Sequence, residues 1–432
     1  MPQPIICLDE EVCHFAERFR SLFSKPQYQY FVTVLLGLLE CEGKRTLSGI
    51  LSKVGEPPSL SGLSRFFSEA PWVQEALVAI WLEHFRAEMQ PLVAAECERQ
   101  RARQPKRRGR RKQPLVTGYL IGDDSTMSKP KGRKMEGLGK HHSTTYDQRI
   151  VGHSLVQGLY VLLDRKSPLA PQLYRQAKVC EAEEVAFQSK IELMETLIRE
   201  FKPVAGTTTH VLLDSWYCAK CLWHAARERD FLITTGLKSN RWLRVPDETT
   251  AQGWRWQKLS EYLAGLTELD FVQTCWPRGG KKVYVHVVTT SVRKLYRCQI
   301  VIVRHSLSAP LSQARYWASS DLEASTEALL VHISARWDIE ILFSDGKEEL
   351  GLDHYQLMSA SAILRFWTLA LLAYVFLEEE QQRLQAVWQR PVTIGEARRE
   401  IQRRHRRCLL VWLHDQFLSG AHPETVFELF AA

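Results

Sequence analysis

The segment VTGYLIGDDS, residues 116–125, decides the fold that this sequence predicts. Its apolar and β-branched residues indicate a strand, and the strand ends in two aspartates, Asp123 and Asp124. The strand pattern QRIVGHSLVQGLYVLLD, a helix pattern at residues 181–201 and the short strand HVLLD, which ends at Asp214, follow in order. Strands that alternate with helices predict an α/β layer fold, in which acidic residues at strand ends mark the edge where sites form.

On the amino-terminal side, residues 1–100 show the apolar spacing of helices and predict a small all-α domain. A linker at 101–114 follows, and its residues 101–112 read RARQPKRRGRRK, with eight basic residues and no acid. The chain has 57 basic and 49 acidic residues, a net charge of +8, so 49 of each remain without this run. The local excess favours a polyanion such as nucleic acid as partner, with a solvated linker or localisation tag as the alternative.

On the carboxy-terminal side, alternating patterns at 242–322 predict a β-rich insertion that divides the α/β core into residues 115–241 and 323–380. A helical region at 381–432 follows. The apolar run Ala360–Leu377 contains Arg365, and we expect a buried core helix and no membrane span. The start MPQPIICLDE lacks a signal-peptide pattern, and ten scattered cysteines favour a reducing compartment, so we expect a cytoplasmic protein.

Carboxylates at three places could together hold divalent cations. Asp123 or Asp124 supplies one ligand from a strand end and Asp214 another, although aspartate is also common there as a turn or cap residue. In SARWDIEILFSDGKEELGL we expect one helix that begins before residue 334. At about 100° per residue, Glu340 then lies about 40° and Lys347 about 20° from Arg336 around the axis. These three residues therefore share one face of the expected helix. The face could supply an acid that binds metal and two cations that bind phosphates, or it could simply be an exposed face with an Arg–Glu ion pair.

These blocks resemble the DDE transposases of bacterial insertion sequences, and most closely the group with the Tyr-Arg-Glu-Lys signature. GDDSTMSKPKGRKMEGLG is similar to the first aspartate block, HVLLDSWY to the second and RWDIEILFSDGKEELGLDHYQ to the glutamate block. The resemblance covers most of residues 20–400, and the blocks occur in order. One position departs from the signature, because Ile333 stands where the family has tyrosine, a supporting group and not a metal ligand.

The resemblance implies an RNase H-like core, a mixed sheet flanked by helices, with Asp124, Asp214 and Glu340 as catalytic and metal-binding residues. Asp124 is preferred because the family acid directly precedes Ser or Thr, and because successive strand residues face opposite ways. Two Mg²⁺ ions, for which Mn²⁺ can substitute, would activate water to cleave the transposon end and then the freed 3′-hydroxyl for strand transfer. The implied partners are double-stranded DNA, as terminal inverted repeats and target, and a second copy in a homodimeric synaptic complex. The implied location is the bacterial cytoplasm, associated with the nucleoid.

Phosphate contacts are expected from the basic residues of the glutamate block, of the loop after the first aspartates, of the KSNR stretch and of the linker. These are Arg336, Lys347, Lys129, Lys131, Arg133, Lys134, Lys238, Arg241, Arg107, Arg108, Arg110 and Arg111. Two other functions remain open besides transposition. One is a metal-dependent endonuclease of the same superfamily that cuts without joining, and the other is a non-catalytic DNA-binding protein descended from a transposase.

Overall fold

The computed structural model describes residues 9–54, 57–103, 115–143 and 147–431. Most of the basic run, including the predicted DNA-binding residues Arg107, Arg108, Arg110 and Arg111, lies outside these described residues.

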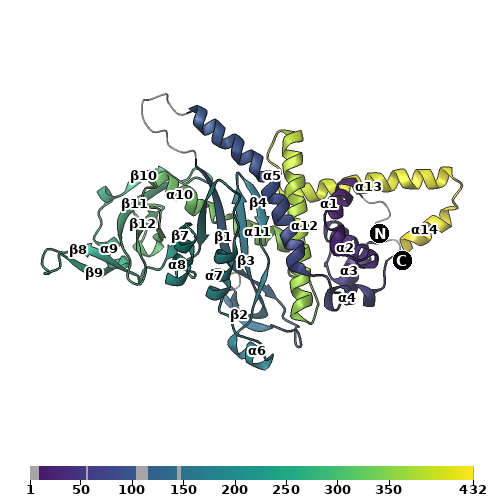
Figure 1. The fold of residues 1–432 in the computed structure, drawn as a ribbon, viewed down its shortest axis with the longest axis horizontal. Helices are drawn as coiled ribbons and strands as arrows, with labels where there is room; N and C mark the ends of the chain where they lie inside the picture. Colours follow the sequence, from purple (N-terminus) through teal and green to yellow (C-terminus); the bar gives the residue numbers. More distant parts are fainter. Residues whose placement is uncertain (1–8, 55–56, 104–114, 144–146, 432) are drawn as a thin grey trace.

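A mixed sheet of 11 strands forms the centre of the molecule (Figure 1). Its order is β10-β11-β12-β13-β7-β6-β1-β3-β2, and β4 and β5 also pair with β3. β1 runs parallel to β6 and antiparallel to β3, and β6 runs parallel to β7. The core strands are β1 (Val116–Ser128), β2 (Gly139–Ser143), β3 (Gln148–Leu162), β4 (Arg165–Pro168), β5 (Gln172–Tyr174), β6 (Thr207–Leu213) and β7 (Leu232–Leu237).

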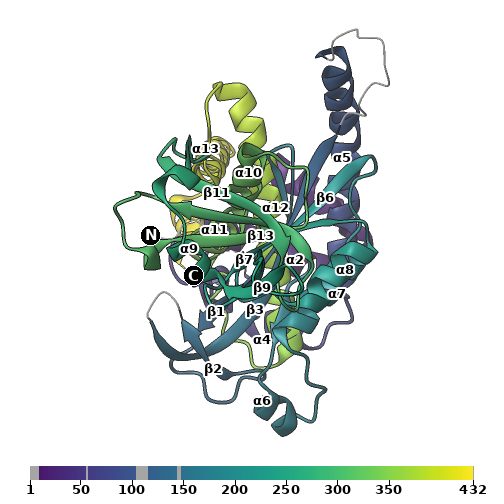
Figure 2. The ribbon, with the colours of Figure 1, turned by 90° about the vertical axis from the view of Figure 1, so that its left-hand side faces the viewer.

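Helices cover both faces of this sheet, and each face of β1 packs against a different set. Leu120 lies in a cluster with residues of α7 (Lys190–Glu200) and α8 (Lys220–Glu228), which Figure 2 shows side by side. Ile121 lies in a second cluster with residues of α11 (Asp338–Glu348) and α12 (Ala360–Trp388). This arrangement confirms the predicted α/β class, a mixed sheet flanked by helices.

The strands of the predicted β-rich insertion continue this sheet. They are β8 (Trp242–Pro246), β9 (Trp254–Lys258), β10 (Val272–Cys275), β11 (Lys282–Ser291), β12 (Arg297–Arg304) and β13 (Arg315–Ser319), with helix α9 (Leu259–Ala264) between β9 and β10. β13 pairs antiparallel with β7, so β10 to β13 extend the core sheet at that edge, whereas β8 and β9 form a separate two-stranded sheet. The insertion therefore holds a fixed position beside the core.

The amino-terminal helices share one hydrophobic core with α12, which lies between them and the sheet (Figure 1). The helices in this layer are α1 (Glu10–Glu17), α2 (Lys25–Glu40), α3 (Leu47–Leu51), α4 (Leu60–Ser68) and α5 (Gln74–Arg103), joined by α13 (Ile394–Leu418); α14 (Pro423–Ala431) follows α13. α5 crosses from this core to the sheet, because Trp81 packs in the first cluster and Phe85 in the second.

One helix of the described residues, α12, is long and apolar enough to cross a membrane by length and composition. Its most apolar window has a mean hydropathy of 1.8, and 83% of that window is buried inside the protein. This burial confirms the predicted core helix. The helix is continuous from Ala360 to Trp388, so the boundary expected at residue 380 falls within it.

Two predicted helices are divided in the structure. Residues 181–201 were expected to form one helix, but α6 (Ala177–Ala182) and α7 are separate. Similarly, the expected single helix around Arg336 consists of α10 (Thr326–Ala335) and α11, with Arg336 as the carboxy-terminal cap of α10. Arg336 and Glu340 therefore do not belong to one continuous helix, although their side chains still meet.

Candidate active site

β1 continues to Ser128, so the expectation that this strand ends at the two aspartates is wrong. Asp123 lies within β1, one residue past the part that pairs with β6, on the face that packs against α10 and α11. Its Oδ2 is 3.1 Å from Arg336 Nη1, and only 14% of its side chain is exposed. Burial, followed by the nearby charge of Asp214, raises the pKa of the Asp123 carboxyl to about 8 despite the opposing effect of Arg336. Asp124 and Glu340 add smaller repulsive contributions to this pKa. Asp123 is therefore a carboxylate crowded by other carboxylates.

Asp214 follows β6 on the neighbouring parallel strand. Gly122 pairs with Leu213, so Asp123 and Asp214 stand side by side at the next positions of the two strands. The Asp214 Oδ1 accepts hydrogen bonds from the backbone N–H groups of Trp216 (2.9 Å) and Tyr217 (3.2 Å). These bonds fix the side chain, and burial still raises the pKa of the Asp214 carboxyl above its ordinary value.

Glu340 comes from the first turn of α11 and completes a group of three acids. Its Oε1 is 3.5 Å from Arg336 Nη1, and 41% of its side chain is exposed. Arg336 thus contacts both Asp123 and Glu340 through the same nitrogen. A guanidinium between two carboxylates reduces their repulsion and orients both.

Asp124, which the sequence resemblance favoured as a metal ligand, faces the other side of β1. Its Oδ2 is 2.5 Å from Lys190 Nζ on α7, and its Oδ1 accepts a hydrogen bond of 2.8 Å from the Tyr217 hydroxyl. The expectation that only one of the two aspartates shares a face with the other acids agrees with this geometry. The residue on that face is Asp123, because the alternation of strand side chains places it with Ile121.

The acids line a groove of about 1260 Å³. Asp123, Asp124, Asp214 and Glu340 all border it, together with the exposed cations Lys140 and Arg149. Acids that bind metal and cations that bind phosphate are the two kinds of group that phosphoryl transfer requires.

The donor set of Asp123, Asp214 and Glu340 fits divalent cations. All three offer carboxylate oxygens, which Mg²⁺ and Mn²⁺ prefer over nitrogen or sulfur ligands. Burial and the charge of Asp214 raise the pKa of Asp123 because both disfavour its negative charge. A divalent cation bound between these carboxylates would stabilise the same negative charge.

Besides Arg336, three of the predicted phosphate-binding cations contact other groups within the protein. Lys129 Nζ donates to the carbonyls of Asp353 (2.5 Å) and Tyr355 (2.6 Å), and burial lowers the pKa of its ammonium group to about 8. Lys347 Nζ donates to Ser125 Oγ at 2.8 Å, and burial lowers its pKa. Arg241 donates to the Cys218 carbonyl at 2.5 Å. Lys131, Arg133, Lys134 and Lys238 are exposed.

Sequence reasoning missed Lys190 and Tyr217, which both contact Asp124. Tyr217 belongs to the block HVLLDSWY, so its position beside Asp214 was visible, but its contact with Asp124 was not. Lys190 opens α7 after the cap residue Ser189, and no local pattern links it to a strand 66 residues earlier.

A mixed sheet with one acid within a central strand, a second at the end of the adjacent parallel strand and a third on a flanking helix defines the class of candidate metal-dependent phosphoryl-transfer enzymes. Within that class, residues 18–260, more than half of the chain, match the family model of the DDE superfamily endonucleases. The chain belongs to this superfamily. Residues 186–376 also match the model of the transposase DDE domain. The predicted DDE relationship is confirmed, whereas the group with the Tyr-Arg-Glu-Lys signature stays a prediction.

No curated protein matches the chain. Among solved structures, the piggyBac transposase synaptic complex with hairpin DNA is similar with a TM-score of 0.39 and 9% sequence identity. The match covers 72% of this chain and 56% of that chain.

Proposed function

We propose that this protein is a transposase that cleaves DNA at the ends of a mobile element and joins the freed 3′-hydroxyl to target DNA. The observation that carries the proposal is the convergence of Asp123, Asp214 and Glu340, with Arg336 in contact with two of them. The superfamily to which the chain belongs supports it, as does the match to a transposase DDE domain.

The proposed metal ligands are Asp123, Asp214 and Glu340, with Asp123 in place of Asp124. Bound Mg²⁺, or Mn²⁺ as a substitute, would supply activation of the attacking oxygen and stabilisation of the leaving oxygen. The backbone N–H groups of Trp216 and Tyr217 hold Asp214 in one orientation at the border of the groove. Burial of Asp123 strengthens its interaction with any cation, because the local dielectric constant is low.

Arg336 is proposed to bind the phosphate at the cleavage site. It stands between two acids and lines a pocket of about 720 Å³ that Asp214 also borders, so a phosphate oxygen bound in this pocket would offer its guanidinium a third anionic partner. Lys131, Arg133, Lys134 and Lys238 are exposed and are proposed to contact the DNA backbone further away, together with the basic run. The homodimer and the cytoplasmic, nucleoid-associated location stay predictions of the resemblance.

Incubation of the purified protein with the DNA that flanks its own gene and Mg²⁺ tests the proposal. We expect cleavage at the element boundary and a joined product when target DNA is added. The variant Asp214→Asn should lose both, because asparagine keeps the hydrogen bonds to Trp216 and Tyr217 but loses the charge. Asp230→Asn is the matched control, since Asp230 is exposed and asparagine tolerates its positive φ of 54°.

The products separate the proposed function from its alternatives. Cleavage without joining would identify an endonuclease that does not transpose. Binding without cleavage, equal in wild type and Asp214→Asn, would overturn the catalytic proposal in favour of a DNA-binding protein.

A further inference from the structure

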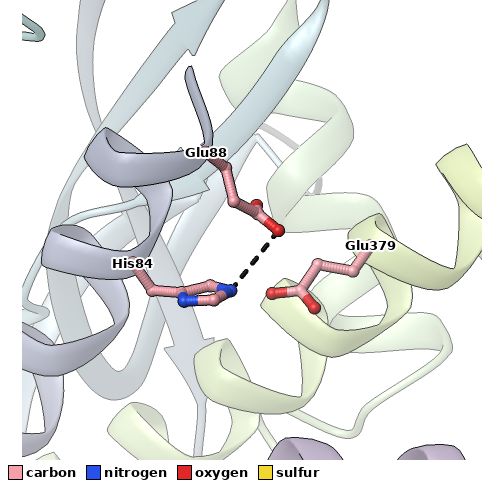
Figure 3. Close-up of side chains that lie close together, drawn as sticks. All are labelled: His84, Glu88 and Glu379. Carbon is pink, nitrogen blue, oxygen red and sulfur yellow. Dashed lines mark ion pairs between the residues drawn. The ribbon is translucent and has the colours of Figure 1, made fainter. Parts of the chain in front are cut away.

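A second group of metal-ligand side chains lies where α5 packs against α12, and it shares no residue with the candidate active site. His84 and Glu88 stand on one face of α5, one turn apart, and Glu379 faces them from α12 (Figure 3). One potential ligand atom from each of the three lies within 4.8 Å of the others. A spacing of four residues on a helix places two ligands on the same side of an ion.

The imidazole of His84 has a nitrogen suited to an ion. Its Nε2 is buried and has no hydrogen-bond partner among the described residues. The same atom lies 3.3 Å from Glu88 Oε1, which is close to the separation of two ligands on one small cation. The side chains of His84 and Glu88 are 36% and 37% exposed, so the group lies close to the protein surface although the Nε2 atom itself is buried.

Each carboxylate has one oxygen held by an arginine. Arg18 donates to Glu379 Oε1 at 2.8 Å, and Arg165 Nη2 is 3.7 Å from Glu88 Oε2. Within the described ranges the other oxygen of each carboxylate has no arginine partner, and that of Glu88 is the atom next to His84 Nε2. Carboxylates that bind metal typically have such outer partners, which fix their orientation.

The ion pairs around this group leave an excess of negative charge. Arg165 also pairs with the buried Glu378, so three carboxylates (Glu88, Glu378 and Glu379) face two guanidinium groups (Arg18 and Arg165). The difference is one negative charge when His84 is neutral. A divalent cation would reverse this excess, whereas a protonated His84 would only balance it.

We propose that His84, Glu88 and Glu379 bind a first-row divalent metal ion that links α5 to α12. One imidazole nitrogen with two carboxylate oxygens suits Zn²⁺, Co²⁺ or Mn²⁺ better than Mg²⁺, which prefers oxygen ligands alone. Because α5 carries the amino-terminal helices to the sheet and α12 is the core helix, the ion would stabilise the joint between these layers. The site takes no part in the proposed cleavage.

Zn²⁺ binding to the full-length protein tests this proposal. The Asp214→Asn, Glu340→Gln double variant serves as the background, since it removes two of the candidate active-site ligands. Equilibrium dialysis gives the stoichiometry, and the visible absorption of bound Co²⁺ gives the ligand environment. His84→Gln and Glu379→Gln are introduced into this background, and Glu83→Gln, an exposed neighbour on α5, is the matched control.

We expect one Zn²⁺ per chain at about 100 µM free metal, and an increase of about 2 °C or more in the unfolding temperature. His84→Gln and Glu379→Gln should weaken binding at least about tenfold, whereas Glu83→Gln should not change it. If His84→Gln fails to fold, metal binding by Glu379→Gln and the Co²⁺ spectrum of the background protein still test whether this group binds the ion. Absence of binding, or equal binding by all variants, would overturn the proposal, and neither result depends on whether the protein cleaves DNA.

Discussion

Asp123 and Asp124 are consecutive residues of one strand, yet they occupy opposite electrostatic environments. Asp123 faces Asp214 and Glu340 and shares Arg336 with Glu340. Asp124 faces α7, where Lys190 and the Tyr217 hydroxyl contact one carboxylate oxygen each. On one side of β1, Asp123 and Glu340 share a single cation, Arg336. On the other side, Asp124 has a cation of its own, Lys190.

This difference indicates that Asp123 is suited to bind metal and that Asp124 is suited to a structural role. Several carboxylates that share one guanidinium group gain from an added divalent cation, whereas a single carboxylate with its own ammonium partner must give up that partner first. We therefore expect Asp124 to act as a positioning residue that ties β1 to α7 and to the loop after β6.

The largest expected effect is on cleavage by Asp123→Asn. Loss of this proposed ligand should reduce the rate of end cleavage by about 10³-fold or more, since metal stabilisation of the transition state is worth several kcal/mol. Asp124→Asn should reduce it by no more than about tenfold, because asparagine still accepts the hydrogen bond from Tyr217. Rates are measured on labelled end DNA in Mg²⁺.

Circular dichroism and binding of end DNA control for folding in both variants. If Asp124→Asn loses cleavage and Asp123→Asn keeps it, the assignment from strand geometry is wrong and the assignment from sequence resemblance holds.

A second effect, of intermediate size, concerns the two cations on either side of β1. Arg336→Met should tighten Mn²⁺ binding to the DNA-free protein by about tenfold, because a positive charge beside Asp123 and Glu340 is removed. The same variant should slow cleavage, because the proposed phosphate contact is lost. Lys190→Met should leave Mn²⁺ affinity within about threefold, because its partner Asp124 is not a proposed ligand.

Electron paramagnetic resonance of free Mn²⁺ measures these affinities, in a His84→Gln background that removes the second proposed site. Weaker Mn²⁺ binding in Arg336→Met would mean that the guanidinium organises the acids more than it competes with the ion. Equal tightening in both variants would show that the two sides of β1 are not electrostatically distinct.

The sequence predicted the parts of this arrangement that depend on local pattern. Strand periodicity predicted the strands that carry Asp214 and the aspartate pair, and these residues do lie on adjacent strands. Helix spacing predicted the contact between Arg336 and Glu340, although the structure makes it across the break between α10 and α11 and not within one helix. The choice between Asp123 and Asp124 depends on which face of β1 packs against α11, and no local pattern contains that information. The roles of Lys190 and Lys129 also depend on contacts between distant segments.

The smallest expected effect comes from Lys129, which follows β1 and turns inward, while Lys131 points to solvent. Lys129→Met removes the hydrogen bonds to the Asp353 and Tyr355 carbonyls and the contact of its ammonium 3.5 Å above the Tyr355 ring. We expect a loss of about 1–3 kcal/mol in the free energy of unfolding, measured with urea. Lys131→Met should change it by less than about 0.5 kcal/mol but should weaken DNA binding more than Lys129→Met does.

The contribution of Lys129 to the free energy of unfolding should also depend on pH. Burial lowers the pKa of Lys129 from 10.5 to about 8 in the folded protein. Between these two values the unfolded chain holds a proton that the folded protein has lost, so the contribution of Lys129 to stability rises with pH in that window. The difference between wild type and Lys129→Met should therefore grow from pH 7.5 to pH 9.5, by no more than about 1.4 kcal/mol per pH unit. A constant difference would mean that Lys129 keeps its ordinary pKa and lies open to solvent, where it would be free to bind DNA.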